Sequence, residues 1–97
     1  MTLRVLLHID IKDGLSDQFE QLWQRHSAFV ATLPDNHGQS LLRRRDDPSR
    51  FVVTSDWTDE PAFRTFERSP QQQQYLQRLW PIRAGGQMIL LDLVSQP

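Results

Sequence analysis

Residues 51–83, FVVTSDWTDEPAFRTFERSPQQQQYLQRLWPIR, contain the pattern that decides the fold, a strand followed by an interrupted helix. The β-branched and aromatic residues at its start predict a strand that ends at Trp57. Pro61 then stands where proline favours the first turn of a helix. We expect Ser69-Pro70 to interrupt this helix and Gly85-Gly86 to close it.

Aromatic residues are concentrated in the same stretch, which holds two of the three Trp, the only Tyr and three of the five Phe. A minimal core in so small a chain needs less aromatic area, so part of it is expected to line an organic-ligand pocket. The alternative is that these rings are plain core. The predicted substrate-binding residues are Phe63, Phe66, Tyr75 and Trp80 from this helix, Val53 from the strand and Trp23 from an earlier helix.

The other strands are predicted from shorter patterns. Residues 3–11 alternate, with one apolar face and one mixed face that holds His8. Residues 39–45 predict a second strand, and residues 46–49 predict a hairpin turn that leads into the third. Residues 87–94 predict a last strand that is apolar on both parities, so we expect both of its faces to be covered.

Between the first two strands, apolar residues at three- and four-residue spacings predict an amphipathic helix. Ser16 is a favourable N-cap, the apolar stripe extends to Leu33, and His26 lies on that stripe. The order β-α-β-β-α-β is the split βαβ of an α+β, ferredoxin-like fold with a four-stranded antiparallel sheet and its helices on one face. Because the first and last strands are apolar on their other face too, we expect that face to pack on a second copy in a dimeric α/β barrel.

Length, charge and cysteine content restrict the possible functions. The 97 residues are expected to form a single domain over residues 1–97. A formal net charge of -1 gives no electrostatic basis for binding nucleic acid or an anionic membrane. The apolar run at the N-terminus is too short and too charged to span a membrane, so a cytoplasmic protein is expected. The absence of cysteine and the scattering of the three His leave a metal site unsupported.

Four features occur together in this chain: the βαββαβ pattern, the turn Lys12-Asp13-Gly14, the segment SDWTDEPAF at residues 55–63, and the later Ser69-Pro70. Together they resemble the antibiotic biosynthesis monooxygenase (ABM) family over nearly the whole chain. The resemblance implies a homodimer of ferredoxin-like subunits with a ligand cavity between the helices and the sheet. For the polyketide-tailoring members, it implies oxidation of an anthrone-like aromatic to a quinone by O₂, without a cofactor.

Such a reaction requires a dry pocket, a proton acceptor and donors for the developing oxyanion. Trp57 matches the family's tryptophan at the end of a strand, whose indole N–H can donate to a substrate oxygen. Val53 and Phe63 stand where the anthrone oxygenases resembled here carry Asn and Tyr, and neither supplies a polar group. Residues 71–79 contain no His, which argues against the haem-degrading branch of the family.

Three further residues complete the predicted catalytic set with Trp57. His26 faces the sheet and can act as a base, or it is a buried His satisfied by a backbone carbonyl. His8 can reach the cavity as a base if its side chain points inward, or it bonds to a neighbouring strand or across the dimer. Arg83 can hold a phenolate or carboxylate, or only complements the dipole of a nearby helix end.

Three functions remain open from the sequence. The first is a cofactor-independent monooxygenase that acts on an aromatic polyketide with O₂. The second is a polyketide cyclase on the same scaffold, which needs the base and the aromatic cavity but no oxygen. The third is a non-catalytic dimeric module that binds an aromatic ligand or a partner enzyme.

Overall fold

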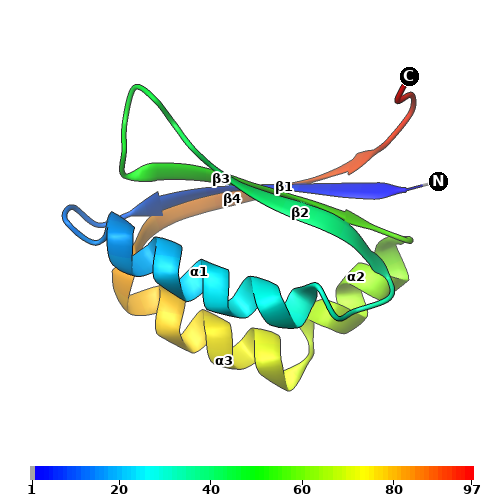
Figure 1. Cartoon of the computed structure of the whole chain (residues 1–97), viewed down its shortest axis with the longest axis horizontal. Helices are drawn as coiled ribbons and strands as arrows, with labels where there is room; N and C mark the ends of the chain where they lie inside the picture. The colour runs from blue at the N-terminus through cyan, green and yellow to red at the C-terminus, as the bar shows by residue number, and fades with distance from the viewer. Residues whose placement is uncertain (1) are drawn as a thin grey trace.

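The computed structural model describes residues 2–97, which form an antiparallel four-stranded sheet with helices on one side (Figure 1). The strand order is β2-β3-β1-β4, and all three strand pairs are antiparallel. This topology confirms the predicted ferredoxin-like split βαβ fold. The elements are β1 (Leu3–Ile11), α1 (Ser16–Val30), β2 (Asn36–Arg43), β3 (Arg50–Trp57), α2 (Glu60–Glu67), α3 (Pro70–Leu79), the 3₁₀ turn η1 (Trp80–Ile82) and β4 (Arg83–Asp92).

Alternation along the strands determines which side chains face the helices. Leu3, Val5, Ile9 and Ile11 of β1 are buried. They belong to two clusters of buried side chains that include residues of α1, α2 and α3, so they lie on the helix-facing side of the sheet. His8 lies on the opposite parity and is exposed. Within residues 2–97, no helix covers this outer face of the sheet (Figure 1).

The break between α2 and α3 has a local cause in the sequence. Asp59 caps α2 by accepting a hydrogen bond from the backbone N–H of Ala62 at 2.9 Å. Ser69 caps α3 in the same way, accepting from the N–H of Gln72 at 3.2 Å. A proline follows each cap in the first turn, where its missing N–H costs nothing. The predicted two-segment helix is therefore confirmed.

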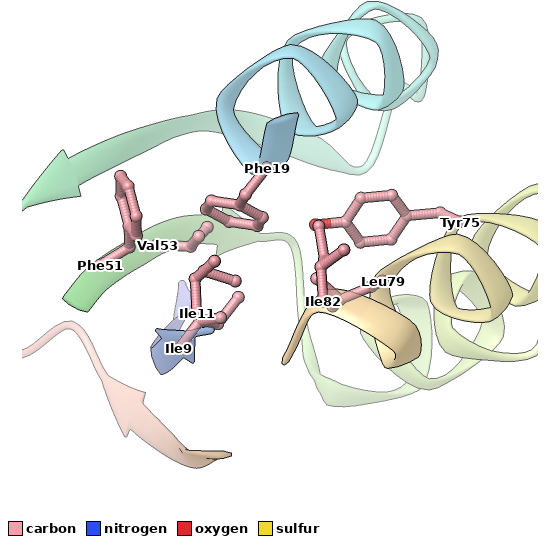
Figure 2. Packing of buried hydrophobic residues seen from close by; sticks show 8 residues of the cluster. All are labelled: Ile9, Ile11, Phe19, Phe51, Val53, Tyr75, Leu79 and Ile82. Carbon is pink, nitrogen blue, oxygen red and sulfur yellow. The ribbon is translucent and has the colours of Figure 1, made fainter. Parts of the chain in front are cut away.

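Two clusters of buried side chains join the sheet to the helices. The larger one, in Figure 2, brings Phe19 of α1 against Phe51 of β3, with ring centroids 4.8 Å apart. Tyr75 reaches into this cluster from α3 with its hydroxyl end foremost (Figure 2). The smaller cluster is built around Trp57 and Phe63 at the other end of the sheet. Aromatic rings from distant segments thus fix how the helices sit on the sheet.

The structure corrects the predicted start of the last strand. β4 begins at Arg83, not at residue 87, and Gly85 and Gly86 lie inside it. Gly86 pairs with Ile9, and a Cβ at Gly86 would lie only 2.6 Å from the carbonyl oxygen of His8. The glycine therefore permits close approach of β4 to β1, and the helix ends at η1 instead.

Smaller differences occur at the ends of α1. Ser16 is the first residue of the helix and not its N-cap, because its hydroxyl donates to the carbonyl of Pro48 at 3.0 Å. The helix ends at Val30, before the predicted Leu33, whose N–H instead closes a turn onto the Val30 carbonyl at 3.0 Å.

β2 is also displaced from its prediction. It runs from Asn36 to Arg43, so His37 lies in the strand and not in a loop. Arg44 leaves the strand and pairs with Asp46 in the hairpin turn.

The prediction that both faces of β4 are covered does not hold within this chain. Ile89 and Leu91 lie on the outer face with 37% and 43% of their surface exposed. Met88, on the helix-facing side, is 41% exposed. The outer face of β4 therefore remains apolar and open between residues 83 and 92.

Candidate active site

A cavity of about 500 Å³ lies between the helix-facing side of the sheet and the three helices. This volume falls within the range of roughly 300–1,000 Å³ that small-molecule sites occupy. The wall is mostly apolar and aromatic, with a few polar groups. It contains Val5, Leu7, Ile9, Trp23, His26, Val30, Gln39, Val53, Ser55, Trp57, Phe63, Phe66, Glu67, Arg68, Gln72, Gln73, Tyr75, Leu76, Leu79, Trp80, Arg83 and Met88.

The structure brings all the predicted site residues except His8 together in this wall. From the predicted catalytic set, Trp57, His26 and Arg83 line the cavity. Residues 51–83 supply most of the wall. The predicted substrate-binding residues that line it are Phe63, Phe66, Tyr75, Trp80, Val53 and Trp23.

His8 does not line the cavity. It pairs with Val52 of β3 and Gln87 of β4 on the outer face, where its side chain is exposed. The neighbouring residues Leu7 and Ile9 point into the cavity instead. The expectation that His8 reaches the cavity is therefore wrong, because one step along a strand moves a side chain to the opposite face.

His26 lies in the wall between α1 and α3 and is held in one orientation. Its Nε2 is 2.6 Å from Oε1 of Gln72, and its ring stacks on Tyr75 with centroids 4.1 Å apart and planes within 5°. Burial lowers the pKa of His26 below its ordinary value, although the hydrogen bond with Gln72 opposes this shift. The imidazole is therefore neutral at pH 7, which is the form that accepts a proton.

His26 and Tyr75 also line a second, smaller hollow. It has a volume of about 180 Å³ and lies between α1 and α3, with Arg25, Gln71 and Arg78 among its other lining residues. The stacked pair therefore stands between the main cavity and this hollow.

Trp57 is almost fully buried, with 1% of its surface exposed. Its ring packs against Phe66 and Phe63, with centroid distances of 4.7 and 5.7 Å. Its indole N–H donates to Oγ of Ser55 at 3.0 Å. The N–H that was expected to donate to substrate is thus already bound to another wall residue.

Arg83 presents an unpaired positive charge to the cavity. Its guanidinium lies over the ring of Trp80, 4.8 Å from the ring centroid, and beside Gly86. Across residues 2–97 no acidic side chain forms an ion pair with it. A guanidinium that is stacked but not neutralised is suited to binding an anionic oxygen.

Tyr75 contributes a phenol hydroxyl. The residue is 8% exposed, and burial raises the pKa of its phenol well above its ordinary value. Its hydroxyl makes no hydrogen bond to any other described residue, although the group can both donate and accept. Tyr75 therefore stays protonated and is available as a donor to a bound molecule.

The sequence prediction missed six polar residues of the wall: Gln39, Ser55, Glu67, Arg68, Gln72 and Gln73. Ser55 had a signal, because it lies two residues before Trp57 and four residues after Phe51 on the same parity of one strand. Gln39 pairs with Ser55 across β2 and β3, which only the register reveals. Gln72 lies in a run of four glutamines, and its contact with His26 depends on how α3 packs on α1.

The described part of the chain contains no group of three or more His, Asp or Glu side chains that could hold a metal ion. None of the helices in residues 2–97 is long and apolar enough to cross a membrane.

Comparison with known proteins gives a consistent assignment. The sequence profile of the family described as antibiotic biosynthesis monooxygenase matches residues 2–78. The chain is 28% identical over 83 residues to Protein SchA of Streptomyces halstedii. The aligned region covers 86% of this chain and 22% of that protein. It is 40% identical over 47 residues to deoxynogalonate monooxygenase of Streptomyces nogalater, which covers 48% of this chain and 40% of that protein. The chain thus spans less than half the length of these curated relatives.

Solved structures show the same fold at lower identity. SnoaB, a cofactor-independent oxygenase from Streptomyces nogalater, matches with a TM-score of 0.88 at 24% identity, covering 98% of this chain and 95% of that chain. A conserved protein from Methanosarcina mazei Go1 matches with a TM-score of 0.88 at 13% identity, covering 94% and 91%. Since the family profile extends over most of its length, the chain belongs to the antibiotic biosynthesis monooxygenase family.

Proposed function

We propose that this protein is a cofactor-independent monooxygenase that oxidises an aromatic, anthrone-like polyketide to a quinone with O₂. One observation carries the proposal: a neutral, half-buried His26 faces an aromatic cavity of about 500 Å³. Membership of the family supports the same class of reaction. So do the names of two relatives, the deoxynogalonate monooxygenase and the cofactor-independent oxygenase SnoaB.

In the first step, His26 removes a proton from the CH₂ group of the anthrone. When Nε2 donates its hydrogen to Gln72, Nδ1 carries the lone pair that takes the proton. The negative charge spreads over the ring system onto the ketone oxygen. Arg83 and the hydroxyl of Tyr75 are the donors that stabilise this oxyanion.

In the second step, the carbanion transfers an electron to O₂, and the resulting radical pair combines into a C–O bond. The peroxide anion formed in this way takes back the proton held by His26, and the resulting hydroperoxide loses water to give the quinone. One oxygen atom enters the product, and the other leaves as water with the two hydrogens of the CH₂ group. The apolar and aromatic wall favours this step because it excludes bulk water from the carbanion.

His26 is neutral again before the next turnover because it has given its proton to the peroxide. The lowered pKa of His26 favours this transfer.

The protein acts as a homodimer in this proposal, and the outer face of the sheet is the contact surface. Leu42, Ile89 and Leu91 are 49%, 37% and 43% exposed on that face, next to partly exposed Leu6 and Val52. Apolar side chains that are contiguous over a sheet face are typical of an interface between copies. The cavity lies on the other side of the sheet and stays open to substrate.

The test is incubation of the purified protein with anthrone, in the presence and absence of air, without added flavin or metal. Anthraquinone absorbance and dissolved oxygen are followed together. We expect quinone formation above the protein-free rate, with one O₂ consumed per quinone. Under nitrogen, neither quinone formation nor oxygen uptake is expected. His26→Ala is expected to remove most of the enhancement.

The other two candidate functions give different results in the same experiment. A cyclase or a binding module binds the polycycle but consumes no oxygen. Binding without oxygen uptake would therefore contradict the monooxygenase proposal.

A further inference from the structure

Apart from Arg83 at the start of β4, two polar side chains interrupt the apolar sheet wall of the cavity. Ser55 of β3 and Gln39 of β2 are directly paired across the two strands and both line the cavity. Val5, on the other side of Ser55, and Val53, two residues earlier in β3, are buried and apolar. The polar pair is therefore an isolated feature of the sheet surface that a ligand contacts.

The hydroxyl hydrogen of Ser55 is not used in a hydrogen bond. Ser55 is only 8% exposed, and its Oγ accepts the indole N–H of Trp57 at 3.0 Å. A serine hydroxyl carries one hydrogen to donate, and that hydrogen has no acceptor among the side chains and backbone groups of residues 2–97. A buried donor without a partner is unfavourable, so an acceptor is expected to come from the molecule that fills the cavity.

We infer that Ser55 donates a hydrogen bond to an oxygen substituent of the bound polycycle, with Trp57 as the positioning residue that orients and polarises the Ser55 hydroxyl. The inference rests on the proposed function only in taking the cavity as the substrate site. The ligand class is a polycyclic ketone or phenol whose oxygen meets β3. A hydrocarbon polycycle of the same shape leaves the hydroxyl unpaired and binds less tightly.

The arrangement favours an anionic oxygen over a neutral one. By donating to Oγ, Trp57 makes the Ser55 hydroxyl a stronger donor. A donor aimed at a phenol oxygen stabilises the phenolate and lowers the pKa of the bound phenol. Gln39, which pairs with Ser55, adds a second group that can hydrogen-bond the same end of the ligand.

The test uses binding, so that it does not depend on oxygen chemistry. The probes are alizarin, a dihydroxyanthraquinone whose visible absorbance reports ionisation of its phenol, and anthracene, which has no oxygen. Binding is measured under nitrogen by quenching of tryptophan fluorescence, since Trp23, Trp57 and Trp80 all line the cavity. The proteins are the natural sequence, Ser55→Ala, Trp57→Phe, and Thr54→Val, which removes a hydroxyl on the opposite face of the same strand.

Ser55→Ala is expected to weaken alizarin binding about three- to tenfold and to change anthracene binding less than about twofold, because only one hydrogen bond is lost. It is also expected to raise the pKa of bound alizarin. Trp57→Phe shifts that pKa in the same direction by less, because the Ser55 hydroxyl remains but loses its orienting partner. Thr54→Val leaves both probes unaffected.

Three results would overturn the inference. The first is equal weakening of alizarin and anthracene binding in Ser55→Ala, which indicates a packing role. The second is unchanged binding and pKa of alizarin in that variant, and the third is no binding of alizarin to the natural protein. Because these readings are made without oxygen, a Ser55-dependent preference for alizarin stands even if the protein shows no oxygenase activity.

Discussion

The two faces of the same sheet differ in the roles of their side chains. On the helix-facing side, Ser55 and Trp57 are buried and line a cavity. On the outer side, Arg4 and Asp56 pair across β1 and β3 at 2.7 Å, and Leu91 remains 43% exposed. Successive residues of a strand alternate between these faces. One short strand can therefore serve a ligand site and a surface for assembly at once.

Variants of the two histidines give the strongest test of the difference between the two faces of the sheet. His26→Ala is expected to lower the rate of quinone formation by about 10²- to 10⁴-fold, which is the usual contribution of a general base. His8→Ala, on the outer face, is expected to change the rate less than about twofold. The measurement is the initial rate of anthraquinone formation in air. A large loss in the His8 variant and none in the His26 variant would reverse the assignment of the faces.

Substitution of Arg83 tests whether a charge inside the cavity affects the reaction more than a charge on the surface does. Arg83→Gln is expected to slow quinone formation by about 100-fold, as loss of one oxyanion donor typically does. The matched control is Arg45→Gln, an exposed arginine in the β2–β3 hairpin, and no change is expected there. Rates at saturating anthrone separate the loss of chemistry from weaker binding. Equal rates for the two variants would show that Arg83 does not act on the reaction.

The pH dependence of the initial rate tests whether His26 acts as the base. Because burial lowers its pKa, the rate should rise with pH, reach half its maximum below pH 6.5 and stay constant above. Gln72→Leu removes the hydrogen bond that raises the pKa, so the half-maximal pH should shift further down. Initial rates between about pH 5 and 9 measure this shift. A half-maximal pH above 6.5 in the natural protein would contradict a buried, neutral base.

The outer face is tested by its oligomeric state. Leu91→Glu places a charge in the proposed contact surface and is expected to convert a dimer into a monomer, a twofold fall in mass by sedimentation. Val94→Glu is the control, because Val94 lies beyond β4 and is 85% exposed. If the natural protein sediments as a monomer, the outer face is not a dimer interface.

Much of this molecule could be predicted from local patterns. The cap-proline pairs at Asp59-Glu60-Pro61 and Ser69-Pro70 specify the break between α2 and α3 without help from the rest of the chain. The position of His26 on an apolar stripe was enough to predict that it lines the cavity. Where residues adjacent in the sequence determine the local structure, the prediction agrees with the structure.

The predictions failed where distant segments meet. β4 starts early because Gly86 allows it to approach the backbone of His8, a contact between residues far apart in the chain. The His26–Gln72 and Trp57–Ser55 hydrogen bonds depend on packing and on rotamers, which periodicity does not determine. The face of His8 stayed open because its strand has apolar residues on both parities.

The most direct test of the central claim is a crystal structure of the protein with anthraquinone bound. We expect the ring system in the cavity between the sheet and α3, close to His26 and Tyr75, with a quinone oxygen within hydrogen-bond distance of Oγ of Ser55. A ring system bound on the outer face of the sheet, with this cavity empty, would show that the cavity is not the substrate site.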